Sequence, residues 1–150
     1  YKTFNIFDII EIINSFFRKI YMRFLVVEDM VVMRRLIINS LQGIGYYDID
    51  GVDSGEEAWE MLAQNDYHCI ITDWLMPGMS GLELAKLVRG TPSTKHIPVL
   101  MITIQAEKKD VRTALLAGVT DFIVKPFNSE TLIEKLDKIL KKREDYIIKK

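Results

Sequence analysis

Four short, uninterrupted apolar runs constrain most strongly what this chain can fold into. They are FLVV (24–27), CIIT (69–72), VLMI (99–102) and FIV (122–124), and many of their residues are β-branched. Runs that are apolar at every position, rather than at alternate positions, are typical of strands buried on both faces of a parallel sheet. A fifth, more polar segment, DIDGV (48–52), is predicted to lie nearer an edge of that sheet.

Apolar residues at helical spacing separate these runs, and glycine or proline follows several of the stripes. Asn128 is the expected N-cap of the last and longest stripe. Five successive strand–helix units imply a doubly wound α/β domain. The predicted core-facing helical residues are Met33, Leu36, Ile37, Leu41, Ala58, Met61, Leu62, Leu82, Ala85, Val88, Val111, Ala114, Leu115, Leu132, Ile133, Leu136, Ile139 and Leu140.

The first 21 residues form a separate amphipathic helical pattern, and Met22 after them looks like a natural start. Asp8 and Glu11 interrupt the pattern, so a signal peptide is not expected. Three interpretations stay open: a helix that docks on a partner or a second copy, a helix packed on its own domain, or upstream sequence without a role. Residues 22–142 are the predicted domain, and residues 143–150 a tail at the cationic end of the last helix.

Composition excludes several classes of function. A net charge of −1 and a pI of about 6.2 are not those of a typical nucleic-acid-binding domain. Cys69 is the single cysteine, which rules out an internal disulfide and fits a reducing cytoplasm. No apolar run reaches the length of a membrane span, and neither a zinc-ligand cluster nor a glycine-rich nucleotide-binding motif is present.

Polar side chains follow each of the four apolar runs. Glu28 and Asp29 follow the first, Asp73 the second, Thr103 the third and Lys125 the fourth. Ligands of parallel α/β sheets bind outside the carboxyl ends of the strands, so these groups are expected to converge on one site. Taken singly, each has a plainer interpretation: a helix cap, a turn acid, a strand-end hydroxyl or a solvated lysine.

Three neighbouring carboxylates repel one another, and a bound divalent cation would remove that repulsion. Oxygen ligands with few protein carboxylates suit Mg²⁺, which keeps water and takes phosphate oxygens. A carboxylate can also attack phosphorus and form an aspartyl phosphate. Mg²⁺, the Lys125 ammonium and the Thr103 hydroxyl would then compensate the phosphoryl oxygens. Asp73 is therefore the candidate acceptor of a phosphoryl group.

The segments FLVVEDMVVMRRL, ITDWLMPGMSGLEL, PVLMIT and FIVKPF resemble the receiver domains of two-component response regulators. The resemblance covers roughly residues 22–140 and is closest to the single-domain chemotaxis type. It implies a flavodoxin-like (βα)5 fold with the parallel strand order 2-1-3-4-5. It also implies that the chain catalyses only its own phosphorylation and dephosphorylation, with a phosphohistidine on a histidine kinase as the donor.

The resemblance assigns roles residue by residue. Asp73 resembles the phosphoacceptor and Lys125 the lysine that pairs with the phosphoryl group. Thr103 and Phe122 resemble a coupled switch, in which the hydroxyl moves toward the phosphoryl group and the ring turns inward. The implied Mg²⁺ ligands are Glu28, Asp29 (the more direct of the acidic pair), Asp73 and the backbone carbonyl of Leu75.

The family's readout surface is formed by its fourth helix, fifth strand and fifth helix, here about residues 107–142. It could be basic and favour an acidic protein partner, or be an ordinary solvated face; its cations are Lys108, Lys109, Arg112, Lys135 and Lys138. No direct nucleic-acid or membrane contact is expected. The alternatives are a phosphorylation-independent module that dimerises through the N-terminal helix, and the receiver part of a longer regulator.

Three residues depart from the chemotaxis type. Leu75 stands where that type has a polar side chain able to orient water, and Ile104 is bulky where many receivers carry Ala or Gly. Both place apolar bulk near the phosphoryl group, so slow self-dephosphorylation is expected, unless the two residues only tune packing. Phe122 lacks a hydroxyl, so its inward rotation would leave no buried phenol in need of a partner.

Overall fold

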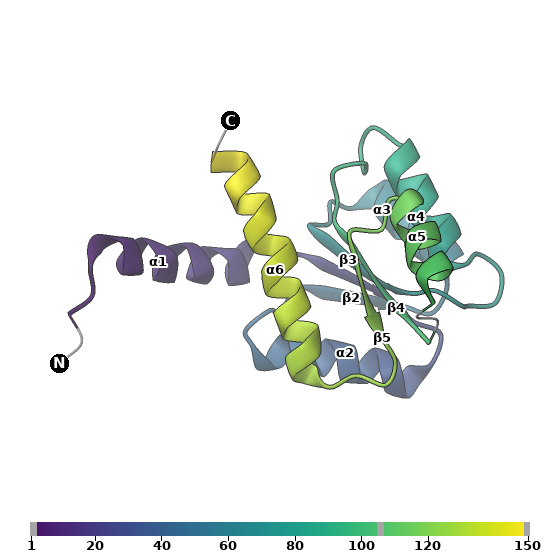
Figure 1. The fold of residues 1–150 in the computed structure, drawn as a ribbon, viewed down its shortest axis with the longest axis horizontal. Coiled ribbons are helices and arrows are strands. Elements are labelled where there is room, and N and C mark those ends of the chain that lie inside the picture. The colour runs from purple at the N-terminus through teal and green to yellow at the C-terminus, as the bar shows by residue number, and fades with distance from the viewer. Residues whose placement is uncertain (1–2, 105–106, 149–150) are drawn as a thin grey trace.

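A computed structural model of the chain describes residues 3–104 and 107–148, with side chains as far as residue 142 (Figure 1). Within these ranges five parallel strands form one sheet in the order β2-β1-β3-β4-β5, as the resemblance implied. The strands are β1 (Phe24–Val27), β2 (Ile49–Val52), β3 (Cys69–Asp73), β4 (Val99–Thr103) and β5 (Asp121–Val124).

Helices cover both faces of this sheet, so the predicted doubly wound architecture is confirmed (Figure 1). α2 and α6 pack on one face, and α3, α4 and α5 pack on the other. The helices are α1 (Ile6–Tyr21), α2 (Val31–Gly43), α3 (Gly55–Gln64), α4 (Gly81–Gly90), α5 (Lys108–Leu116) and α6 (Ser129–Ile148). Asn128 caps α6 as predicted, because its Oδ1 accepts a hydrogen bond of 2.9 Å from the Thr131 N–H.

The apolar strands are buried because both of their faces lie against helices. In β1, Leu25 and Val27 join the core under α3–α5, and Phe24 and Val26 join the core under α2 and α6. All residues of β1, β3 and β4 are buried, as the continuous apolar runs predicted. Burial of each such aliphatic or aromatic side chain contributes roughly 1.5–3 kcal/mol.

The prediction that the FIV run is buried on both faces is wrong. In β5 only Ile123 is buried, while Phe122 is half-buried and Val124 is exposed. β5 is the last strand of the sheet, with a neighbour on one side only, and the helices do not cover it completely. Two helix residues predicted to face the core are also exposed, Leu115 of α5, next to the buried Ala114, and Leu36 of α2.

The predicted N-terminal helix is present and extends away from the sheet (Figure 1). A capping box begins it, because Asn5 Oδ1 accepts from the Asp8 N–H at 2.9 Å and Asp8 Oδ2 accepts from the Asn5 N–H at 3.1 Å. None of the residues of α1 is buried. The apolar side chains of α1 face solvent, so the interpretation of a helix packed on its own domain has no support from that apolar side.

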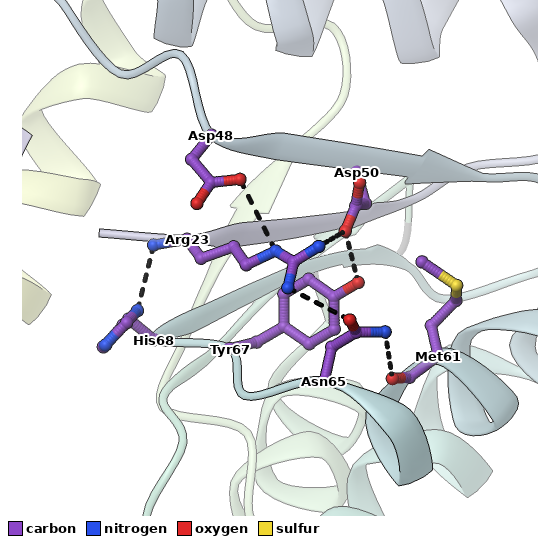
Figure 2. Close-up of polar contacts among 7 residues, drawn as sticks. All are labelled: Arg23, Asp48, Asp50, Met61, Asn65, Tyr67 and His68. Carbon is purple, nitrogen blue, oxygen red and sulfur yellow. Dashed lines mark hydrogen bonds and ion pairs between the residues drawn. The ribbon is translucent and has the colours of Figure 1, made fainter. Parts of the chain in front are cut away.

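The amino end of the sheet, where the strands begin, carries a polar network centred on Arg23 (Figure 2). Its guanidinium lies 2.9 Å from Asp50 Oδ2 and 3.5 Å from Asp48 Oδ1, and it donates to Asn65 Oδ1 at 3.1 Å. The Tyr67 hydroxyl also donates to Asp50, and the Tyr67 ring lies 5.1 Å from the guanidinium carbon. This network links the starts of β1, β2 and β3.

Among the helices that the structure describes, none combines the length and the apolar composition that crossing a bilayer requires.

Candidate functional site

The polar residues that follow the apolar runs meet at the carboxyl end of the sheet, where the strands finish. Glu28 and Asp29 follow β1, Asp73 ends β3, Thr103 ends β4 and Lys125 follows β5. The strand register keeps these positions level, because Val27 pairs with Thr72, Asp73 with Ile102, and Thr103 with Val124. The predicted convergence of acids and lysine is confirmed by their distances.

Three carboxylates and one ammonium group form the centre of the site. One carboxylate oxygen from each of Glu28, Asp29 and Asp73 lies within 4.8 Å of the other two. The Lys125 Nζ lies 3.3 Å from Asp73 Oδ2 and 3.7 Å from Glu28 Oε1. Among these four side chains negative charge exceeds positive charge, which favours a bound cation.

Glu28 shows the imbalance most clearly, because it is fully buried with 0% of its surface exposed. Burial, and next the negative charge of Asp73, raise the pKa of the Glu28 carboxyl from 4.5 to about 7, although Lys125 lowers it. Both carboxylate oxygens are buried and accept no hydrogen bond from the part of the chain that the structure describes. These oxygens, which lack hydrogen-bond donors within that part of the chain, and the all-oxygen donor set fit Mg²⁺.

Main-chain contacts hold Asp73 in place. Its Oδ1 accepts a hydrogen bond of 2.9 Å from the Trp74 N–H, so Oδ2 is left toward Lys125. Gly81, at the start of α4, donates its N–H to the Trp74 carbonyl at 2.8 Å. A Cβ on Gly81 would lie 1.9 Å from the Asp73 carbonyl oxygen, so only glycine fits there. This contact explains the final glycine of the DWLMPGMSG segment.

The two predicted switch residues lie on neighbouring strands. Thr103 is buried, and its carbonyl accepts a 2.7 Å hydrogen bond from the Lys125 N–H. Phe122 is half-buried and packs against the core under α3–α5. Lys135 of α6 places its Nζ 5.7 Å from the centroid of the Phe122 ring and 3.2 Å from Asp121 Oδ1. No local pattern in the sequence indicates this lysine, because the contact joins β5 to a later helix.

The two apolar departures lie near the same end of the sheet and face solvent. Leu75, two residues after Asp73, is 51% exposed, and Ile104, directly after Thr103, is 68% exposed. Neither is part of the hydrophobic core, so the interpretation that they only tune core packing loses its support. The part of the Leu75 carbonyl as a metal ligand stays a prediction.

Comparison with known proteins agrees with this geometry. Residues 24–137 match the family model described as the response regulator receiver domain. The chain is 49% identical over 120 residues to the chemotaxis protein CheY1 of Helicobacter pylori, covering 79% of this chain and 97% of that protein. It is 44% identical over 121 residues to the chemotaxis protein CheY-3 of Vibrio cholerae, covering 81% and 93%.

Solved structures show the same likeness. The chemotaxis response regulator CheY4 of Vibrio cholerae superposes with a TM-score of 0.74 at 32% identity, covering 79% of this chain and 98% of that one. A response regulator from Chloroflexus aurantiacus gives a TM-score of 0.75 at 34% identity, covering 79% and 97%. Receiver domains are signalling proteins that bind Mg²⁺ through an acidic cluster, and Glu28, Asp29 and Asp73 lie close together in this chain. The chain belongs to the response regulator receiver domain family and is CheY-like within it.

Proposed function

We propose that this receiver accepts a phosphoryl group on Asp73 from a phosphohistidine of a histidine kinase, in a magnesium-dependent reaction. The observation that carries the proposal is the position of Asp73 at the carboxyl end of the sheet, 3.3 Å from Lys125 and beside two further carboxylates. A purely structural aspartate would not need a buried glutamate next to it whose oxygens accept no hydrogen bond within the described residues.

In this reaction a carboxylate oxygen of Asp73 attacks phosphorus, and the bond between phosphorus and the histidine nitrogen breaks. The leaving imidazole keeps the electron pair and takes up a proton. Lys125 would pair with the transferred group, since its ammonium already faces Asp73 Oδ2. Mg²⁺ held by Glu28, Asp29, Asp73 and the Leu75 carbonyl would neutralise the acids and the phosphoryl oxygens.

The signal would pass from the site to the surface through Thr103 and Phe122. Once Asp73 carries a phosphoryl group, the Thr103 hydroxyl would donate to it and leave space beside β5. Phe122 is half-buried, so its ring can turn inward into that space. The ring would then move away from the Lys135 ammonium, which couples the site to α6.

The proposed readout surface consists of α5, β5 and α6, within residues 107–142. Exposed apolar residues on it, Leu115, Leu116 and Val124, can contact a protein partner directly. Its cations would favour an acidic partner, and chemotaxis is the pathway that the names of the relatives suggest. The proposed division of the chain is an extension (1–21), a receiver (22–142) and a tail (143–150). The proposed partner of the extension is a second copy of the chain.

The test is adduct formation with acetyl phosphate or beryllofluoride, with and without Mg²⁺, followed by intact-mass spectrometry for acetyl phosphate and ¹⁹F NMR for beryllofluoride. The wild type should gain one adduct with Mg²⁺ present, and Asp73→Asn should gain none. Asp50→Asn is the matched control, because it removes a carboxylate at the amino end of the sheet. Equal labelling of Asp73→Asn, or none of the wild type, would favour the alternative of a phosphorylation-independent module.

A further inference from the structure

The most unusual surface of the molecule is the apolar stripe of α1. Seven residues spaced as on one face of a helix have between 44% and 66% of their surface exposed: Ile6, Ile9, Ile10, Ile13, Phe16, Phe17 and Ile20. The helix extends away from the sheet, so the rest of the domain leaves this stripe uncovered (Figure 1). A contiguous stripe of this kind marks a contact surface.

We propose that the stripe pairs with the α1 stripe of a second copy, in an antiparallel dimer whose two-fold axis passes beside Ile13. The inference is independent of phosphorylation, because α1 leads into the amino end of β1 and Asp73 lies at the carboxyl end of the sheet.

The spacing of the stripe supports a two-fold axis. Its intervals of 3, 1, 3, 3, 1 and 3 residues read the same in both directions from Ile13. In an antiparallel pair each residue therefore meets an apolar residue: Ile6 lies opposite Ile20, Ile9 opposite Phe17, and Ile10 opposite Phe16. Two-fold interfaces require such self-complementary surfaces, and the repeat matches the apolar seam of paired helices.

The charges of α1 favour the same orientation. Asp8 and Glu11 lie in the first half of the helix, and Arg18 and Lys19 lie in its last turn. An antiparallel pair places the acidic half of one helix beside the basic half of the other, and it also opposes the two helix dipoles. A parallel pair would bring like charges together and would crowd both receiver domains at one end.

The area of the stripe suits a dimer. Seven half-exposed isoleucine and phenylalanine residues offer roughly 700–800 Å² per copy, which is close to the share of each partner in a standard protein interface. A membrane surface suits α1 less well. Helices that lie on membranes carry a polar face rich in Lys and Arg, whereas this one carries two acids and two bases.

The first experiment measures the mass of the full chain by light scattering after gel filtration, at tens of micromolar. The wild type should be a dimer and Ile13→Asp a monomer. Asn14→Asp is the matched control, since it adds the same residue one position away on the polar face, and it should stay dimeric. A monomeric wild type, or an Ile13→Asp variant that remains dimeric with unchanged helix content, would overturn the proposal.

The second experiment tests orientation by disulfide formation. An Ile6→Cys/Ile20→Cys variant should form covalent dimers on mild oxidation, and Ile6→Cys alone should not, because its two copies lie at opposite ends of the pair. Rapid cross-linking of Ile6→Cys alone would overturn the antiparallel arrangement. The natural Cys69 is buried, and oxidation of the unmodified chain measures how much covalent dimer forms through Cys69 alone. Wild-type monomers that cosediment with phosphatidylcholine–phosphatidylglycerol vesicles would identify a membrane as the occupant instead.

Discussion

The two ends of the sheet carry charged groups in opposite balance. At the amino end, the Arg23 guanidinium lies between Asp48 and Asp50, and Asn65 and Tyr67 complete its contacts (Figure 2). At the carboxyl end, three carboxylates share the single ammonium of Lys125, and the buried oxygens of Glu28 accept no hydrogen bond from the part of the chain that the structure describes.

The difference separates a structural network from a binding site. The groups at the amino end pair with one another through hydrogen bonds and, between Arg23 Nε and Asp48, through an ion pair alone, so they stabilise the fold without a further component. The carboxylates at the carboxyl end repel one another, and a bound cation would relieve that repulsion. Charge imbalance among neighbouring groups is therefore a better guide to function in this molecule than the number of polar contacts.

Substitution of Arg23 tests the polar network at the amino end of the sheet most directly. Arg23→Ala leaves Asp48 and Asp50 without their cation and removes the stacking on Tyr67, so we expect a loss of about 2 kcal/mol in the free energy of unfolding. Urea denaturation measures it. Lys109→Ala is the control, because its pair with Glu107 is exposed and worth less than about 1 kcal/mol. Equal losses of unfolding free energy in Arg23→Ala and Lys109→Ala would show that the amino-end network stabilises the fold no more than an exposed ion pair does.

The second prediction concerns pH at the carboxyl end. The pKa of Glu28 is raised to about 7 in the folded chain, so its contribution to stability is present below about pH 4.5 and is lost as the pH rises through 7. Without Mg²⁺ we expect the Glu28 contribution to lower Tm by several °C between pH 5 and 8. Mg²⁺ should restore it, more at pH 8 than at pH 6, since the ion binds the ionised carboxylate.

Glu28→Gln is the matched variant for that experiment, because it keeps the side-chain size and removes the titration. Its Tm without Mg²⁺ should depend less on pH than that of the wild type, as followed by circular dichroism. If the Tm of the wild type and that of Glu28→Gln depend on pH in the same way, ionisation of Glu28 does not destabilise the carboxyl end of the sheet.

The smallest expected effect is kinetic. Leu75 is exposed beside the site and cannot orient a water molecule, so Leu75→Asn should shorten the lifetime of phosphorylated Asp73 severalfold, or about 1 kcal/mol in activation free energy. Loss of the phosphoryl group is timed after removal of acetyl phosphate. Leu87→Asn, an exposed leucine of α4, is the control and should decay at the wild-type rate. An unchanged rate for Leu75→Asn would remove the idea that apolar bulk slows hydrolysis.

The parts of the molecule that could be predicted are those in which the residue types of one segment indicate whether that segment is buried or exposed. β1, β3 and β4 were predictable because every residue is buried and most are apolar, and Glu28 and Asp73 were predictable because each is an acid that follows such a run. The order of the strands came from the family resemblance, since hydrophobic periodicity does not specify which strands are neighbours.

Features that depend on distant pairs were not predictable. Arg23, Asp50 and Tyr67 lie on or beside different strands, and nothing in their spacing indicates one network. The contact of Lys135 with Phe122 likewise joins two elements whose relative position is set by packing. Leu115 follows helical periodicity yet is exposed, because the extent of the core on each side of a helix depends on its neighbours.

The close approach of Gly81 to the Asp73 carbonyl bears on how this chain tolerates change. Gly81 has no functional group, yet any larger residue there must displace the main chain that carries Asp73. In a saturation library scored for signalling, Gly81 would therefore rank beside Asp73 in intolerance, although the two are intolerant for different reasons. Substitution of Asp73 would remove its carboxylate, whereas substitution of Gly81 would create a steric clash with the main chain.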